Sequence, residues 1–328
     1  MDVHLITPDG VTDHDVAALP ELLARPDGIV WVDVPQWDDD ARHVLETVFH
    51  VHPLALRDAA SRNRLPKVHA YPDALFLIVH APERGDGGHV HHVELDRFVG
   101  ARFLVTVHGP VNPAVPPDVP VRDTREVLER IRAGRLHPRT PFDISHAVVS
   151  ALARRMEQFI ETLTEEVWDL EKRVTSGAYD DPERFLDEMF RTRHGLLSAR
   201  TMAAQTGEIY RRVASLSTRA VPQESRGLVL DLVDQFDRLA SLADMEQHYL
   251  QGVIEFYRAR TDTKMTIAAE RLAVIAVVTL PVTALASVLG MNLIVNQRTT
   301  VAPLILALTV MVAMSLSLLV WAKRRGWW

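Results

Sequence analysis

The segment LAVIAVVTLPVTALASVLGMN, residues 272–292, has no charged side chain, and a second uncharged segment occupies residues 301–321. An α-helix needs about 20 apolar residues to cross the roughly 30 Å hydrocarbon layer of a bilayer. We therefore interpret residues 272–292 and 301–322 as two transmembrane helices. The alternative is a pair of buried helices in a soluble core, but such helices seldom extend past about 20 residues without a charge.

The linker between the two spans, residues 293–300, is too short for a domain, so the spans predict a hairpin with both chain ends on one side. Its single charge is Arg298, whereas Lys323, Arg324 and Arg325 directly follow the second span. Positive charge collects on the cytoplasmic side of membrane proteins. We therefore expect a multi-pass protein of the inner (plasma) membrane with an extracytoplasmic loop at 293–300, a basic cytoplasmic tail at 323–328, and a cytoplasmic N-terminus.

The composition of the chain limits the classes of function. The 328 residues carry a formal charge of -7, and because residues 272–328 hold only positive charges, residues 1–271 hold -11. The chain has no cysteine, which excludes disulfides and thiolate catalysis. The N-terminus lacks the basic start of a cleavable signal peptide. Because no phosphate-binding loop or catalytic arrangement of acids and nucleophiles is visible, we expect neither enzymatic activity nor a nucleic-acid partner.

The residues before the first span predict two further regions. Apolar, β-branched segments at 28–34, 74–80 and 102–108 are typical of strands, and helical patterns at 38–49 and 54–60 lie between them. These segments indicate an α/β domain over residues 1–142. Residues 143–271 predict long helices, which we place at 144–174, at 182–216 in antiparallel contact with the first, and from about 224 onward into the first span.

Acidic side chains crowd the predicted long helices. A solvated helix face explains such a pattern, and the alternative is that some of the acids bind Mg²⁺ or Ca²⁺ at subunit interfaces, since these ions prefer oxygen ligands. The acids are Glu157, Glu161, Glu165, Glu166, Asp169 and Glu171 in the first helix and Asp231, Asp234, Asp237, Asp244 and Glu246 in the third.

A histidine tract, HVHH at residues 89–92, follows a predicted hairpin turn at residues 84–88. Histidines this close together can bind a transition metal, but nothing nearby completes a tetrahedral structural site. We interpret the tract as a surface loop and keep the metal site as the alternative.

One stripe of the first predicted span and the helix that leads into it combines small, hydroxyl and leucine side chains with a polar group at each end. Steps of three or four residues place these positions on one face. Rings of leucine would form hydrophobic constrictions that gate a pore by dewetting. Small and hydroxyl residues also serve close helix packing, which is the alternative interpretation. The stripe consists of Glu255, Asp262, Thr266, Ala269, Leu272, Ala276, Leu280, Thr283 and Ser287, with Asn292 beyond its outer end.

Three motifs, in order along the chain, resemble the CorA family of divalent-cation channels over nearly the whole length. HPLALRDAASRNRLPKVHAYPDALFLIVH (52–80) and RFLVTVHGP (102–110) are similar to segments of the α/β domain in that family. The first span has the family's proline nine residues before Gly-Met-Asn, and the second span ends in a basic cluster and Trp. The resemblance implies a funnel-shaped homopentamer with a cytoplasmic α/β domain, a long helical bundle and a pore lined by the first span.

The resemblance also implies roles for individual residues. It places the selectivity filter on Gly290, Met291 and Asn292, and the hydrophobic gate on Leu272 and Leu280. It places an inner pore ligand on Thr266, where the family has asparagine, and an acidic inner mouth on Glu255. A regulatory metal site falls on Asp231, with a partner near Asp86 from the neighbouring subunit. The implied ion is Mg²⁺, both transported and regulatory, with Co²⁺, Ni²⁺ or Zn²⁺ as further candidates.

The loop after Gly-Met-Asn departs from the family pattern. Most members carry an acidic Met-Pro-Glu-Leu loop, but this chain has LIVNQRTT with Arg298 and no carboxylate. Arginines around a pore mouth would oppose cation access. The related ZntB branch, associated with proton-coupled zinc uptake, also varies here and is the first alternative. A non-conducting membrane scaffold or sensor is the second.

Overall fold

A seven-stranded mixed sheet organises the N-terminal part of the chain. Its strand order is β2-β1-β3-β7-β6-β5-β4, and the β3–β7 pair is parallel while the other neighbours are antiparallel. The strands are β1 Asp2–Thr7, β2 Gly10–His14, β3 Ile29–Val34, β4 Lys67–Ala70, β5 Ala74–Arg84, β6 Val90–Gly100 and β7 Phe103–Val107. The strands expected at 28–34, 74–80 and 102–108 correspond to β3, β5 and β7.

The structure is a computed structural model that describes residues 1–178, 181–217, 220–290 and 301–324, without the side chains of 289 and 301–304. The chain divides into two compact units, Met1–Val253 and Ile254–Trp328. We call these the first and the second unit and describe each separately.

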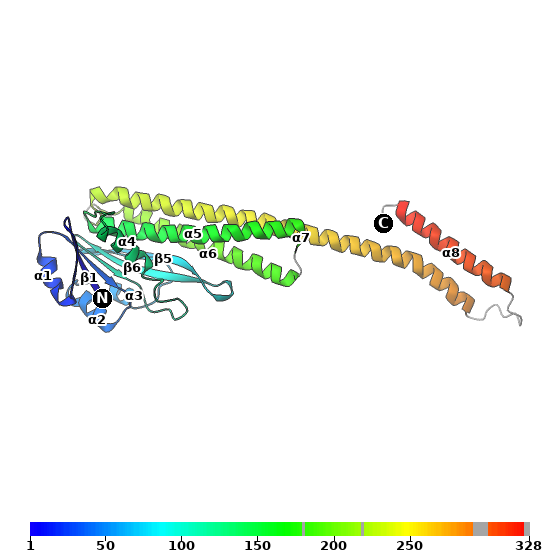
Figure 1. Cartoon of the computed structure of the whole chain (residues 1–328), viewed down its shortest axis with the longest axis horizontal. Coiled ribbons are helices and arrows are strands. Elements are labelled where there is room, and N and C mark those ends of the chain that lie inside the picture. The colour runs from blue at the N-terminus through cyan, green and yellow to red at the C-terminus, as the bar shows by residue number, and fades with distance from the viewer. Residues whose placement is uncertain (179–180, 218–219, 291–300, 325–328) are drawn as a thin grey trace. The chain divides into compact units, whose positions relative to one another are not determined.

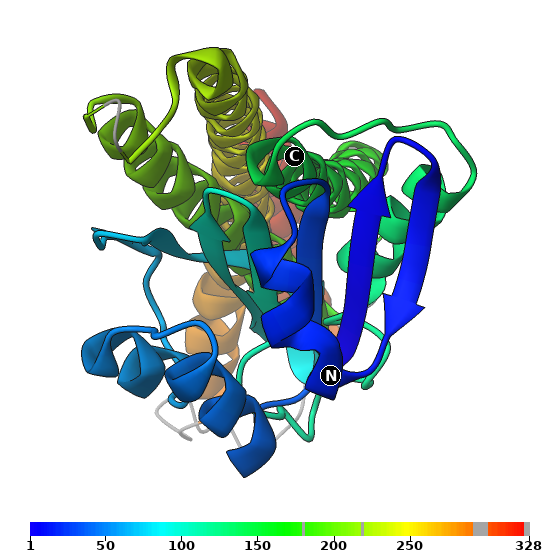
Figure 2. The same ribbon diagram turned by 90° about the vertical axis from the view of Figure 1, so that its left-hand side faces the viewer.

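Helices of the first unit cover both faces of the sheet, and Figure 2 shows the short helices α2 and α3 and the long green helices on opposite sides. One face packs against the short helices through Val30, Val32, Phe76 and Phe98. The other face contacts the longer helices α4, α5 and α6. The helices are α1 Leu19–Ala24, α2 Asp39–Thr47, α3 Pro53–Ala59, α4 Arg122–Arg132, α5 Pro141–Ser176 and α6 Pro182–Ala214. Short 3-10 turns occur at Val16–Ala18, Asp86–Gly88 and Gln223–Ser225.

Local signals in the sequence explain where the long helices begin and end. Thr140 caps α5 in a reciprocal capping box with Asp143, which satisfies otherwise unpaired backbone N–H groups. Gly177 ends α5 with φ of 76°, a left-handed conformation that glycine adopts without a steric penalty. Asp181 then caps α6, and Pro182 occupies its first turn. The predicted break between the two helices is therefore confirmed.

Helix α7 (Arg226–Gly290) contributes its first part to the first unit, where it packs on α5 and α6 (Figure 1). The rings of Tyr210 and Phe236 stack with their planes 5° apart, and Arg211 on α6 donates to Asp237 at 2.7 Å. The remainder of α7 and helix α8 (Val301–Arg324) belong to the second unit. The predicted fold class, an α/β domain with long helices and two C-terminal apolar helices, is confirmed.

The histidine tract differs from the loop that we expected. The turn at Gly85–Gly88 does join β5 and β6, with Arg84 opposite Val90 in the hairpin. However, Val90, His91 and His92 already belong to β6, so the loop interpretation holds only for His89. The described residues contain no group of three His, Asp or Glu side chains placed to hold a metal ion.

Candidate pore and regulatory residues

Two helices of the described chain are long and apolar enough to cross a membrane, within Gln223–Val288 and Ile305–Arg324. In the second unit the membrane-length part of α7 has one covered face. Val274 is 8% exposed and the other members of this face are half-buried. Helix α8 has a matching covered face that ends at Ala322, which is 2% exposed. The covered positions are Val274, Val277, Val278, Pro281, Val282 and Leu285 on α7, and Ala307, Met311, Met314, Ser315, Leu318, Leu319 and Ala322 on α8.

The spacing of three and four residues places each covered set on a single helix face. In the described part of the second unit, α7 and α8 are the elements that can cover one another. We therefore infer that the two covered faces pack against each other. Ala and Ser residues on the α8 face allow close approach to the valines of α7. The hairpin therefore buries a valine face and leaves the rest of α7 available for other contacts.

Except for the half-buried Ala276, the membrane part of the predicted pore stripe lies on the uncovered side of α7. Leu272 and Leu280 are 68% and 67% exposed, Thr283 and Ser287 are exposed, and Ala276 is half-buried. At about 100° per residue, the membrane part of this stripe is centred roughly opposite the valine face. The hairpin thus presents these side chains away from α8.

The hydroxyls on α7 keep acceptor capacity for a ligand. The Thr266 hydroxyl donates to the Asp262 carbonyl at 2.9 Å, and the Thr283 hydroxyl donates to the Thr279 carbonyl at 2.9 Å. Each donor is thereby satisfied within the helix, whereas the oxygen can still accept. A stripe of such oxygens can accept hydrogen bonds from the water shell of an ion.

The ends of the stripe are only partly described. Glu255, Asp262 and Ala269 are exposed in the second unit. Gly290 is the last residue of α7, and a Cβ added there would meet nothing within 4 Å. Met291 and Asn292 lie outside the described residues, as does the loop 293–300.

The predicted regulatory acid already has partners within its own chain. The Asp231 carboxylate is 2.6 Å from His146 Nε2 on α5 and accepts from Gln235 at 2.6 Å. The hydrogen bond from His146 lowers the pKa of Asp231, and the Gln235 amide acts in the same direction against the effect of burial. A metal ion at Asp231 would therefore share or displace these two donors. Asp86 is exposed in the β5–β6 turn, which packs on α6, so one chain does not assemble a site from these acids.

Polar residues that the sequence pattern did not reveal form a buried network under α4. Asp33 on β3 accepts from His108 at 2.8 Å, from Thr124 at 3.1 Å and from the Thr106 hydroxyl. Burial alone would raise the pKa of Asp33, but the charge and hydrogen bond of His108 and the two hydroxyls outweigh it, so this pKa is lowered. The network joins β3, β7 and α4.

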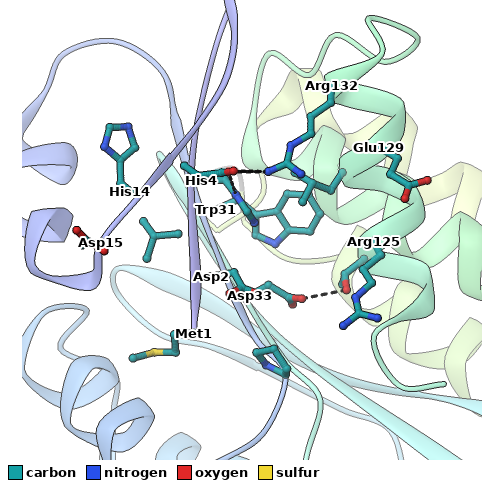
Figure 3. A pocket seen from close by; sticks show the side chains of 15 residues that line it. Met1, Asp2, His4, His14, Asp15, Trp31, Asp33, Arg125, Glu129 and Arg132 are labelled. Carbon is teal, nitrogen blue, oxygen red and sulfur yellow. Dashed lines mark hydrogen bonds and ion pairs between the residues drawn. The ribbon is translucent and has the colours of Figure 1, made fainter. Parts of the chain in front are cut away.

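A polar cavity of about 560 Å³ lies beside this network, between β1, β2 and α4 (Figure 3). In it Arg132 donates to Asp13 at 2.6 Å, and Asp13 also pairs with His4 at 2.6 Å. These three side chains pair with one another. The residues that line the cavity are not members of the pore stripe.

The motif RNRLP has a structural role centred on Asn63. The Asn63 backbone N–H and its side-chain amide both donate to Glu94 on β6 at 2.7 Å. His80 on β5 is 3.0 Å from the Asn63 carbonyl, which can accept from the Nε2 proton. The strands thus hold the segment 60–66 against the sheet.

We expect protonation of His80 at acidic pH to weaken the contacts that hold segment 60–66 against the sheet. Burial lowers the pKa of His80 from 6.5 to about 4, although its bond to Asn63 opposes the shift. The folded protein therefore binds fewer protons than the unfolded chain between these values, and the free energy of unfolding falls as pH decreases from 6.5 toward 4. The loss is at most about 3 kcal/mol, or roughly 10 °C in unfolding temperature.

Thermal unfolding of the detergent-solubilised full chain across this pH range measures the effect. His80→Gln keeps a donor without the titration, so its unfolding temperature should vary less with pH than that of the wild type. Equal pH dependence in both proteins would show that His80 does not contribute.

An α/β unit combined with two C-terminal membrane-length helices defines a two-span integral membrane protein. The family described as "CorA-like Mg2+ transporter protein" matches residues 26–324, and the chain belongs to this family. It is accordingly a membrane protein of a divalent metal transporter family, whose members are transporters or channels and not enzymes.

Two similar proteins cover nearly the whole chain, and a third covers 80% of it. "Putative metal ion transporter YfjQ" of Bacillus subtilis (strain 168) is 23% identical over 314 residues, covering 94% of this chain and 92% of its own. The complete CorA magnesium transporter structure from Methanocaldococcus jannaschii has a TM-score of 0.82 at 14% identity and covers 100% of this chain and 99% of that one. The ZntB cytoplasmic domain from Vibrio parahaemolyticus has a TM-score of 0.62 at 12% identity, with 80% and 98% covered. These structures share the fold.

Proposed function

We propose that the protein is a channel for gated influx of Mg²⁺, with Co²⁺ and Ni²⁺ as further substrates, and that it works as a homopentamer. The observation that carries this proposal is the exposed stripe of α7 opposite the valine face that α8 covers. A single hairpin encloses no pathway, so several copies must surround an axis. The exposed leucines and hydroxyls of the stripe would then line the pore.

The chemistry of the stripe suits an ion that keeps its water shell. Mg²⁺ loses its waters reluctantly, so neutral hydroxyl and amide groups can recognise it through those waters. Both termini would lie on the cytoplasmic side of the inner membrane. The membrane potential then favours inward movement of a doubly charged ion by a free energy of roughly 4.6 kcal/mol per 100 mV. Influx therefore needs no chemical reaction.

Cysteine accessibility tests the pore position directly, because the chain has no native cysteine. The cysteine thiolate is the nucleophile that attacks a charged thiol-specific reagent, and it forms only in water. We expect Ser287→Cys and Thr283→Cys to react with such a reagent in proteoliposomes and to lose divalent flux. Val278→Cys on the covered face and Leu306→Cys on exposed α8 should react slowly and keep their flux. Equal reaction at Leu306→Cys and Ser287→Cys would remove the stripe from the pore.

We also propose that cytosolic Mg²⁺ closes the channel by bridging Asp231 to Asp86 of the neighbouring subunit. Bound metal would stabilise the closed ring, and its loss would leave the acids to repel one another. Asp231→Ala should raise the internal Mg²⁺ concentration needed for half-inhibition roughly tenfold, since one metal ligand is lost. Asp234→Ala is the matched control, because Asp234 is an exposed acid on the same helix. An unchanged inhibition curve for Asp231→Ala would make this residue part of a solvated face.

Zinc uptake coupled to protons is the second candidate. The observation that favours it is the loop LIVNQRTT, which has Arg298 and no carboxylate to concentrate Mg²⁺.

A further inference from the structure

A pair of buried acids on β6 has no role in the proposed pore. Glu94 and Asp96 are 6% and 0% exposed. Alternate residues of a strand share a face, so both acids lie on the same side as Phe98. Asp96 is opposite Ile78 on β5 and Val107 on β7, two members of the apolar core. The sheet thus places two carboxyl groups side by side in a dry environment.

The hydrogen bonds of the two acids are unequal. Both oxygens of Glu94 accept from Asn63, one from its backbone N–H and one from its side-chain amide. Neither oxygen of Asp96 has a donor among the residues that the structure describes. The two acids are close enough for each to shift the pKa of the other. A carboxylate at Asp96 would be an unpaired buried anion beside a second anion, which is strongly unfavourable.

A protonated Asp96 removes this conflict. As a neutral acid it can donate its O–H to the Glu94 carboxylate, which keeps its two bonds to Asn63. Burial raises the pKa of Asp96 well above its usual range, and the negative charges of Glu94 and Asp58 act in the same direction. Burial raises the pKa of Glu94 as well, but the Asn63 donors favour its ionised form, so the proton stays on Asp96.

The other charged groups around the pair do not supply the missing partner. Asp58 on α3 is paired with Lys67 on β4 at 3.1 Å, and His80 on β5 is held neutral by burial. Arg97 of the same strand lowers the pKa of Asp96 but donates to Ser145 and Tyr210. Arg62 in the adjoining segment acts on Glu94. No third metal ligand joins the acids in the described chain, so the geometry suits a proton and not a metal ion.

We propose that Glu94 and Asp96 form a binding site for one proton, which latches the segment 60–66 onto the sheet through Asn63 and releases it when the proton leaves at alkaline pH. This site goes beyond the proposed transport function and does not rest on it. The folded state binds the proton more tightly than the unfolded chain, so the site stabilises the protein at low pH. That stabilisation decreases as pH rises from the ordinary Asp value through the folded one.

Two neutralising substitutions should have opposite effects. Asp96→Asn keeps a neutral donor beside Glu94, so segment 60–66 should stay closed as pH rises from 6.5 to 9. Glu94→Gln replaces one acceptor oxygen with an NH₂ group that faces the donors of Asn63, so the segment should be open at every pH. Simple removal of a negative charge would change both variants in the same direction.

Trypsin measures the opening in the full-length protein, because Arg62 and Arg64 are exposed within the segment. Cleavage at these residues is divided by cleavage after Arg135, which is exposed outside the segment. Between about pH 6.5 and 9 the ratio should rise roughly tenfold in the wild type and remain low in Asp96→Asn. In Glu94→Gln the ratio should be high throughout. A flat ratio in the wild type, or the same pH dependence in wild type and Asp96→Asn, would overturn the proposal.

Infrared spectroscopy provides a second measurement that does not depend on how well the variants fold. The wild type at neutral pH should show the C=O stretching band of a buried protonated carboxyl group, and the band should disappear at alkaline pH. Absence of the band from the folded wild type at neutral pH would also overturn the proposal.

Discussion

Asn292→Ala is expected to reduce divalent-cation flux in proteoliposomes at least about tenfold, to the level of empty vesicles. The asparagine amide can both donate and accept hydrogen bonds, so a ring of amides can bind the water shell of Mg²⁺. Alanine offers neither function. Residue 292 lies outside the described residues, so its role rests on the family resemblance of the Gly-Met-Asn motif and stays a prediction.

The matched control is Asn296→Ala, which removes the same amide from the loop four residues further on. Flux of this variant should remain close to that of the wild type. Full activity of Asn292→Ala, or an equal loss in both variants, would show that the filter does not depend on the amide of residue 292.

Leu280→Ala is expected to increase flux under closed conditions, with millimolar Mg²⁺ inside the vesicles, by roughly tenfold. Leucine side chains around a narrow pore exclude water and thereby block ions. A shorter side chain widens the constriction and lets water enter, so the closed state should conduct.

Leu306→Ala on α8 separates a pore effect from a general effect of the substitution. Leu280 and Leu306 are both 67% exposed in the single chain, so the two variants remove the same side chain from equally exposed sites. Only Leu280 lies on the stripe opposite α8. If Leu306→Ala increases closed-state flux as much as Leu280→Ala, the pore does not run along this face of α7.

The strongest periodic signals in the chain predicted the two membrane-length helices and the faces of the first one. A helix face repeats every three or four residues, so the residue pattern alone separates the valine face from the stripe. The pattern of buried positions on both helices in the structure further indicates that α8 covers the valine face. Residues 272–290 by themselves could not reveal this, because packing and pore lining favour similar small side chains.

Strand β6 shows why other elements were missed. Its sequence VHHVELDRFVG contains Glu94, Asp96 and Arg97, charged residues that are usually exposed to solvent. All three are nevertheless buried. Asn63 donates to Glu94, and Arg97 donates to Ser145 and Tyr210, all partners far away in the sequence. Interactions across 31 to 113 residues leave no periodic trace in the sequence.

From the residues alone, the proposed regulatory site could be predicted only by residue type, and the family resemblance was needed to select Asp231. The acidic pattern indicated Asp231 as one of many candidates, but it could not show that His146 and Gln235 already hydrogen-bond this carboxylate. Its proposed partner belongs to another copy of the chain, so the assembly is needed to complete the site.

The most direct test of Mg²⁺ channel function is a flux panel for the purified protein in liposomes, with Mg²⁺, Co²⁺, Ni²⁺ and Zn²⁺ each offered with and without a pH gradient. We predict Mg²⁺ influx that follows the membrane potential, needs no pH gradient and is lost in Asn292→Ala. Zn²⁺ flux that requires the pH gradient, with no Mg²⁺ flux, would contradict the account, as would vesicles that stay impermeable to all four ions.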